Sequence, residues 1–340
     1  MERCCFPRYY LRVSLGKPNN CGERTRKTAP LTHDVILVSE MKKSVIFLLL
    51  TFAMSWTIAF CAFSCGIRLY TVPWFIVAVL FMFTPMISAI ITQKFIFHEN
   101  ILKPLGVSFR INRWFIIALL LPAFLAVGTT LVSVLFPDVS ITLDPAEANV
   151  FAFFENIPID QRVTDISFLP VHPFILTLIA GTLAGLTING IAGFGEELGW
   201  RGLLIHESAS LGFWKSSWII GTVWGVWHLP FIINGYNYPG HPIAGVFMMT
   251  LWTILFSPII AYVRIRSSSV ISAAIMHGAI NGTAMTPAIV LKGGDSLTIG
   301  VMGVAGLVVL LLMNLLLISF GKPSKWHNIW LNADGINAAG

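Results

Sequence analysis

The stretch FGEELGWRG, residues 194–202, places two adjacent carboxylates and an arginine inside a sequence that is otherwise apolar or rich in glycine. Residues 173–194 lead into it and are long and apolar enough to cross a bilayer as a helix. We therefore expect Glu196, Glu197 and Arg201 to lie at membrane depth. Each such charge costs about 2.5–3.5 kcal/mol to insert, so these residues persist mainly where they pair, face a cavity or have a function.

Helix geometry separates the two glutamates. Glu197 precedes Arg201 by four residues, the favourable orientation for an ion pair, whereas Glu196 is rotated by about 100° to a different face. A carboxylate without a local partner in an apolar environment is suited to accept a proton from water, so Glu196 is the candidate base. The other interpretation is a structural ion pair that holds helices together, with Glu196 as a bystander.

The composition excludes an ordinary soluble domain. Of the 340 residues 56% are hydrophobic and 11% are charged, and the mean hydropathy is +0.78, which together indicate a polytopic membrane protein. The net charge of +6 comes from basic residues scattered between apolar segments, a distribution that membrane topology explains and that indicates no nucleic-acid partner. The five cysteines form neither a disulfide framework nor a zinc ribbon.

Apolar segments of nearly membrane-spanning length recur along the chain, and we predict an all-α polytopic membrane protein of about eight transmembrane helices. The segments are residues 44–66, 72–92, 114–136, 173–194, 217–233, 243–263, 270–290 and 299–320. Residues 137–171 are the long connection, which we expect to be an external loop. Residues 1–40 are basic and lack hydrophobic periodicity, and Met41-Lys42-Lys43 resembles a second start, so we expect either a disordered basic tail or a native chain that begins at Met41.

Lysine and arginine predict the orientation. With a cytoplasmic N-terminus, most basic residues fall on the cytoplasmic side and few outside, so both termini should be cytoplasmic. We thus expect an integral membrane protein, in the cell membrane if the source is prokaryotic, with the glutamate pair towards the cytoplasmic end of the fourth span.

Two histidines and an asparagine are further polar groups at membrane depth. His228 lies in WGVWHLP, and Asn281 follows His277 by four residues, so the latter two share one helix face. Trp224 likewise precedes His228 by four. A lone membrane histidine commonly serves packing, but two of them together with the glutamates favour a functional site. Pro230 should kink the helix next to His228.

Glycine spacing indicates which helices meet. Pairs four residues apart let helix backbones approach closely, and they occur on the fourth, fifth and seventh predicted helices, which carry the polar groups. The pairs are Gly181 and Gly185, Gly195 and Gly199, Gly221 and Gly225, and Gly278 and Gly282. We infer that these three helices pack together and place the active-site cavity between them.

Two chemistries would use this set of residues. A carboxylate and an imidazole can activate water while a second imidazole and an amide stabilise an oxyanion, the minimum for peptide hydrolysis. Alternatively, Glu196, His228 and His277 bind one zinc ion with water as the fourth ligand. The spacing does not separate these alternatives, so the cofactor is either one zinc ion or none.

The three motifs resemble those of the CPBP family of CAAX proteases and bacteriocin-processing enzymes, also called the Abi or type II CAAX prenyl endopeptidase family. Its pattern is EExxxR, an aromatic residue four positions before a histidine, and HxxxN or HxxxB, matched here by Glu196-Glu197-x-x-x-Arg201, Trp224-x-x-x-His228 and His277-x-x-x-Asn281. The family aromatic is more often Phe, a departure that we expect to leave the histidine unaffected. The three motifs cover only about residues 173–290. We divide the chain into an N-terminal tail (1–40), N-terminal helices with the external loop (41–171), the core that the resemblance makes catalytic (172–290) and a last helix with a cytoplasmic tail (291–340).

By this resemblance the protein is an intramembrane endopeptidase, either a metalloprotease or a glutamate-dependent enzyme, acting on membrane-associated peptides that are prenylated or bacteriocin-related. The resemblance implies that Glu196 and His228 activate water, that His277 and Asn281 stabilise the oxyanion, and that Glu197 with Arg201 shapes the site. The alternatives are a proton-coupled transporter and a non-catalytic immunity or scaffold protein. The sequence predicts neither the substrate nor the oligomeric state.

Overall fold

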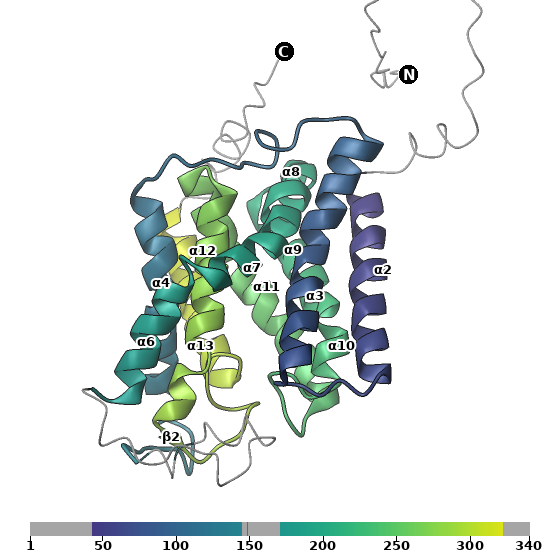
Figure 1. The fold of residues 1–340 in the computed structure, drawn as a ribbon. Coiled ribbons are helices and arrows are strands. Elements are labelled where there is room, and N and C mark those ends of the chain that lie inside the picture. Colours follow the sequence, from purple (N-terminus) through teal and green to yellow (C-terminus); the bar gives the residue numbers. More distant parts are fainter. Residues whose placement is uncertain (1–42, 145–147, 149–170, 322–340) are drawn as a thin grey trace, which may run out of the picture. The chain divides into compact units, whose positions relative to one another are not determined.

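The computed structural model describes residues 43–144, 148 and 171–321. The predictions for the N-terminal tail, for most of the external loop and for the C-terminal tail lie outside these residues. The described chain is an all-α protein with one two-stranded sheet, so the predicted fold class is confirmed (Figure 1). The expected orientation of the termini stays a prediction.

The N-terminal helices match the first three predicted spans. They are α2 (Lys43–Ser64), α3 (Val72–Ile90) continued by the π-helical η1 (Ile91–Ile96), and α4 (Arg113–Ser133). Pro85 interrupts the hydrogen-bond ladder of α3, because it has no N–H for the carbonyl of Phe81. The Thr84 hydroxyl donates to that carbonyl at 2.7 Å, which satisfies the acceptor that Pro85 leaves without an N–H.

The fourth predicted span is a broken helix. It consists of α6 (Pro173–Ala184) and α7 (Ile188–Glu197), followed by the π-helical η4 (Leu198–Leu204) and the short α8 (Ile205–Glu207), with a bend of 51° at the break. The main chain folds back closely at the break: a Cβ added to Gly190 would lie 2.1 Å from the carbonyl oxygen of Gly185. Only glycine permits that approach.

The remaining helices carry the later motifs. They are η5 (Ala209–Leu211), α9 (Phe213–Trp227), α10 (Leu229–Ile232), α11 (Pro242–Ser267), α12 (Val270–Thr283), η6 (Thr286–Ile289) and α13 (Val304–Gly321). Strand β1 (Ser140–Ile141) pairs antiparallel with β2 (Leu291–Lys292) and ties the segment after α4 to the segment before α13.

Each of the eight predicted spans coincides with a helix or a broken helix, but fewer are long enough to cross a bilayer alone. Within the described residues, α2, α3 with η1, α4 and α11 have the length and apolarity of a span, and the bent α6–α8 unit makes a fifth. The helices α9 and α12 have 15 and 14 residues, respectively. The protein is therefore polytopic, and the count of eight crossings stays a prediction.

The glycine pairs bring helices together, but not in the single bundle that the sequence predicted. Gly181 meets Gly282 across α6 and α12, and Gly278 meets the main chain of Asn189 across α12 and α7. Gly221 and Gly225 of α9 instead face residues 250–254 of α11. The inference that α9 uses its glycines against α7 and α12 is therefore wrong, since that face of α9 is already occupied by α11.

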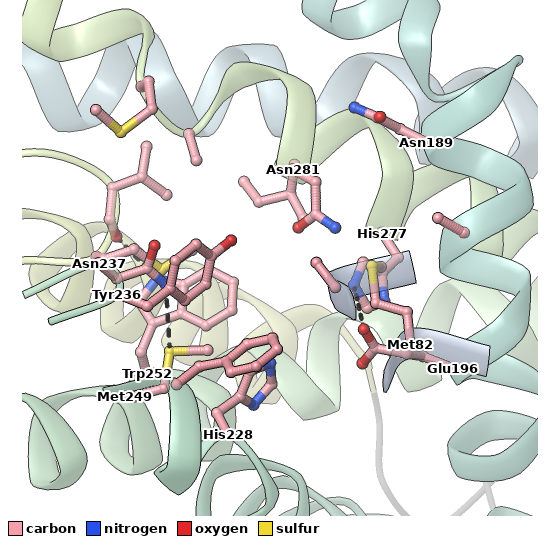
Figure 2. Close-up of a pocket in the computed structure, with 18 of the residues that line it drawn as sticks. Met82, Asn189, Glu196, His228, Tyr236, Asn237, Met249, Trp252, His277 and Asn281 are labelled. Atoms are coloured by element: carbon pink, nitrogen blue, oxygen red, sulfur yellow. Dashed lines mark hydrogen bonds and ion pairs between the residues drawn. The ribbon is translucent and has the colours of Figure 1, made fainter. Parts of the chain in front are cut away.

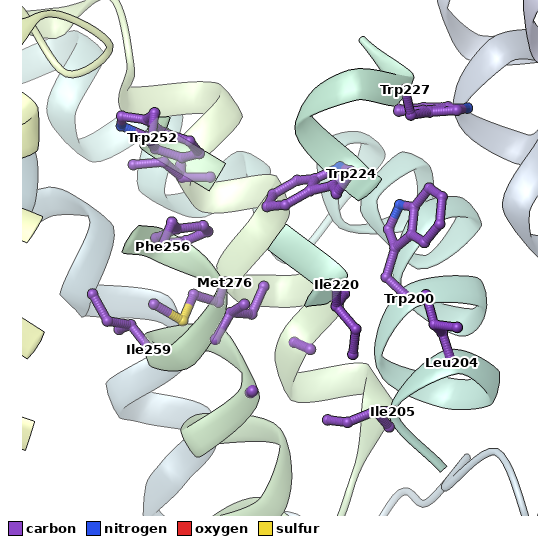
Figure 3. Packing of buried hydrophobic residues seen from close by; sticks show 14 of the residues in the cluster. Trp200, Leu204, Ile205, Ile220, Trp224, Trp227, Trp252, Phe256, Ile259 and Met276 are labelled. Carbon is purple, nitrogen blue, oxygen red and sulfur yellow. The ribbon is translucent and has the colours of Figure 1, made fainter. Parts of the chain in front are cut away.

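Large aromatic side chains fill the space between these helices. Trp200, Trp224 and Trp227 are buried beside one another, and Phe256 of α11 packs on the same cluster (Figure 3). The ring centroids of Trp200 and Trp227 are 5.7 Å apart with an edge-to-face geometry, an arrangement that aromatic pairs favour. This cluster packs η4 against α9.

Candidate active site

Glu197 and Arg201 form the buried ion pair that the four-residue spacing predicted. Nη1 of Arg201 donates to Oε1 of Glu197 at 3.1 Å, and both side chains are fully buried. Nδ1 of His277, on α12, donates to the same oxygen at 2.7 Å. Oε1 of Glu197 thus accepts from one donor on η4 and one on α12, and these contacts join the two helices.

The guanidinium of Arg201 has further contacts that connect η4 to α9 and α11. Nη2 donates to Oγ of Ser257 at 3.2 Å, and the charge lies 4.5 Å from the ring centroid of Trp224. The carbonyl of Arg201 accepts from Nε of Arg264 at 3.1 Å. Arg264 itself lies against Gly106, where a Cβ would be 1.8 Å from Nη2. These contacts fix a π-helical segment, a geometry that is frequent at functional sites.

Glu196 lies on the other face of α7, as the helix geometry predicted. Its side chain lines a cavity, and Oε2 accepts a hydrogen bond of 2.8 Å from Nε1 of Trp224. Oε1 is 3.7 Å from Nε2 of His277. Glu196 therefore has two neighbours on other helices, Trp224 and His277, which spacing along one helix could not show.

His228 occupies the break between α9 and α10. Pro230 prevents a continuous helix, as predicted, and Nδ1 of His228 lies 2.8 Å from the carbonyl oxygen of Trp224. A carbonyl only accepts, so Nδ1 carries the proton and Nε2 of the neutral ring keeps its lone pair. That tautomer leaves Nε2 available as a base.

A cavity of about 550 Å³ collects the predicted residues. Glu196, His228, His277 and Asn281 all line it, and Figure 2 shows them projecting into the same space from α7, the α9–α10 break and α12. Glu197 and Arg201 lie behind this wall. The cavity therefore lies between the fourth, fifth and seventh predicted helices, as expected. Helix α9, the fifth of these, lines the cavity while its glycine face packs on α11.

The sequence analysis missed a large part of the cavity wall. Further lining comes from α3, from the loop between α10 and α11, from α11 itself and from the segment before α13; the residues include Trp74, Met82, Tyr236, Met249, Trp252 and Met302. These residues are apolar or aromatic, and in a membrane protein such residues are typical of every helix. No spacing signal distinguishes them from lipid-facing side chains.

The zinc alternative requires three ligands that converge. Among the residues that the structure describes, no three His, Cys, Asp or Glu side chains are grouped at metal-binding distances. Glu196, His228 and His277 line one cavity without forming such a set. Nδ1 of each histidine has a partner in the protein, an arrangement that histidine ligands of metals also show. The choice between one zinc ion and none therefore stays a prediction.

A comparison with protein families agrees with this arrangement. Residues 177–283 match the family described as type II CAAX prenyl endopeptidase Rce1-like. The chain carries an Rce1-like domain. This finding confirms the resemblance to the CPBP family and supports an intramembrane protease. A comparison with curated proteins found no match.

The Rce1-like domain contains all six predicted site residues, from Glu196 on α7 to Asn281 on α12. It also contains Tyr236 and most of the wall that α11 provides. Helix α3 and the segment that contributes Met302 lie outside the matched residues but still line the cavity. The cavity is therefore completed by parts of the chain on both sides of the Rce1-like domain.

Proposed function

We propose that this protein is an intramembrane endopeptidase in which Glu196 and His228 activate the attacking water. The observation that supports the proposal is that a carboxylate, two imidazoles and an amide from three separate elements line one membrane-depth cavity. Charged and polar groups are costly at such a depth, and their convergence is what acid–base catalysis needs.

The two proposed bases are linked through one residue. Trp224 holds the Glu196 carboxylate through its indole N–H and holds the His228 ring through its carbonyl. A water molecule between Oε of Glu196 and Nε2 of His228 would lose a proton to one of them as it attacks the peptide carbonyl. The same group can return the proton to the leaving amine.

His277 and Asn281 are proposed to stabilise the tetrahedral intermediate. They lie one helical turn apart on the cavity face of α12. The Asn281 amide can donate to an oxyanion directly. Nε2 of His277 can donate when the ring is protonated, a form that the neighbouring Glu197 and Glu196 carboxylates favour. Donors fixed before the reaction are a main source of rate enhancement in acyl transfer.

The chemistry of the cavity lining supports a proposal for the substrate class. Apart from the catalytic groups, the wall is mostly aromatic and aliphatic, including Trp74, Phe231 and Met249. A cavity of that kind suits a peptide that carries or adjoins a lipid-like group. We propose a membrane-associated peptide or protein as substrate, prenylated at a CAAX-type cysteine or bacteriocin-related.

The test is cleavage by the full chain in lipid vesicles. Lipid-anchored peptides, with and without a farnesylated cysteine, are incubated with the wild type, Glu196→Gln and His228→Gln, and products are identified by mass spectrometry. Glu207→Gln is the matched control, because Glu207 pairs with Lys43 at 3.4 Å outside the cavity. We expect cleavage by the wild type and the control only.

Cleavage at the wild-type rate by both site variants would contradict the proposal. Proton-coupled solute uptake that needs Glu196, without any peptide product, would instead favour a transporter. Folded, vesicle-inserted wild type with neither activity would favour a non-catalytic immunity or scaffold protein.

A further inference from the structure

Tyr236 brings a phenol to the catalytic cavity from a loop that the motifs do not include. It lies between α10 and α11 and lines the cavity with Asn281 (Figure 2). In the figure the hydroxyl points into the space between the two side chains. The phenol is also close enough to Glu196 for their charges to interact. The hydroxyl thus faces the region where the proposed reaction takes place.

The backbone around Tyr236 is built to hold this position. Gly235 has φ +96° and Asn237 has φ +63°, so residues on both sides adopt the left-handed conformation. Asn237 is one of the few residue types that tolerate it, and glycine adopts it without strain. The loop therefore turns sharply on each side of Tyr236.

Aromatic neighbours fix the ring itself. The centroid of the Tyr236 ring is 5.4 Å from Trp74, 6.0 Å from Phe231 and 6.2 Å from Tyr70. Two of these rings come from α3 or the turn before it, far from Tyr236 in sequence. A side chain packed on three rings has little rotamer freedom, so its hydroxyl is already placed before a substrate arrives.

Neighbouring Tyr238 shows what a structural tyrosine looks like in the same loop. Its ring is fully buried, and its hydroxyl donates to the carbonyl of Met302 at 2.9 Å. The hydroxyl of Tyr236, in contrast, makes no hydrogen bond to the residues that the structure describes, and neither does the amide of Asn281. Two donors that face one cavity without protein partners are free to bind a ligand oxygen.

We propose that Tyr236 is a further catalytic residue, whose hydroxyl donates a hydrogen bond to the scissile carbonyl oxygen as it becomes an oxyanion, from the side opposite Asn281. The inference rests on the proposed endopeptidase function. No bond of the tyrosine is made or broken: the phenol keeps its proton and withdraws charge from the intermediate, and the proton of the attacking water still goes to Glu196 or His228.

The electrostatic environment keeps the phenol protonated. Burial is the main cause that raises the pKa of Tyr236 above its usual value, and the neighbouring Tyr70 and Glu196 charges act in the same direction. The hydroxyl therefore remains a donor at any pH at which the carboxylates work.

The experiment compares Tyr236→Phe with Tyr238→Phe in vesicles, using the lipid-anchored peptide that the wild type cleaves. Both changes remove one hydroxyl and keep the ring. Loss of one oxyanion donor lowers kcat by about a hundredfold to a thousandfold. We expect that loss for Tyr236→Phe with an unchanged KM, and wild-type kcat per folded molecule for Tyr238→Phe.

A binding measurement keeps the inference independent of folding. A phosphonate analogue of the same peptide imitates the tetrahedral intermediate, and Tyr236→Phe should weaken its binding by a similar factor. Binding of the uncleaved peptide is measured in the Glu196→Gln background, where adding Tyr236→Phe should leave the affinity unchanged. A raised KM with unchanged kcat, or equal affinity for the phosphonate, would overturn the inference. Wild-type kcat in Tyr236→Phe beside an inactive Glu196→Gln would overturn it and leave the endopeptidase function intact.

Discussion

The indole Nε1 of Trp224 donates a hydrogen bond of 2.8 Å to Oε2 of Glu196. A phenylalanine at this position, as the family motif more often has, could not make that bond. We expected the tryptophan to leave the neighbouring histidine unaffected, and its carbonyl does hold His228 as any residue could. The indole of Trp224 nevertheless differs from a phenylalanine ring in function, because its N–H orients Glu196, the proposed base.

The first prediction concerns this bond. Trp224→Phe keeps an aromatic ring under the Arg201 guanidinium but leaves Oε2 of Glu196 without its donor. A hydrogen bond to a charged group is worth about 1.5–3 kcal/mol, so kcat/KM should fall by about tenfold to a hundredfold. Peptide cleavage in vesicles measures it. The control is Trp214→Phe, at the start of the same helix and away from the cavity; an equal effect of both changes would refute the orienting role.

The second prediction concerns the buried ion pair. Arg201→Met removes the cationic partner of Glu197 at a fully buried position and leaves His277 as its donor; breaking a buried ion pair costs about 3–5 kcal/mol. We expect a marked drop in melting temperature in detergent. Adding Glu197→Gln to Arg201→Met should restore part of the stability, since it removes the charge that Arg201 had paired. Additive losses in the double variant would show that the two residues act independently.

The third prediction tests the close contact of α7 and α12. In Gly278→Ala the new Cβ would lie 2.5 Å from the main chain of Asn189, so the helices must separate and His277 must move away from Glu196. Both stability and cleavage should fall. Gly128→Ala is the matched control: its Cβ would meet Val309 at an ordinary 3.6 Å, and alanine is favoured in a helix by about 1 kcal/mol. Equal melting temperatures of the two variants would contradict the packing argument.

The fourth prediction concerns metal dependence. Because the described His, Cys, Asp and Glu side chains form no group of three at metal-binding distances, we expect cleavage to survive prolonged dialysis against a chelator. The measurement is the rate before and after dialysis, with metal content determined on the same samples. Loss of activity that added zinc restores would instead support ligation by Glu196, His228 and His277 in a rearranged site.

The chemistry of the site could be predicted from local spacing. The Glu197–Arg201 ion pair, the different faces of Glu196 and Glu197, and the shared face of His277 and Asn281 all depend on positions within one helix. Helical periodicity fixes these relationships before any tertiary contact forms. Pro230 likewise marked the break at His228, because proline lacks the N–H that a continuous helix needs.

The sequence predicted less well which helices pack against one another. Glycine pairs showed that helices approach closely but not which helix lies on the other side, and the glycines of α9 proved to face α11. A small-residue stripe is complementary to many partners, so its sequence carries little information about the one it meets.

The sequence by itself determined an all-α membrane protein and the residues able to carry its chemistry, because apolar length and polar residues at membrane depth are properties of the chain alone. Only the tertiary structure decided that Trp224 donates to Glu196, that His277 bonds Glu197, and that Tyr236 faces Asn281 across the cavity. Those contacts join residues on different helices and loops, and their geometry follows from how aromatic and glycine faces pack, which no local spacing encodes.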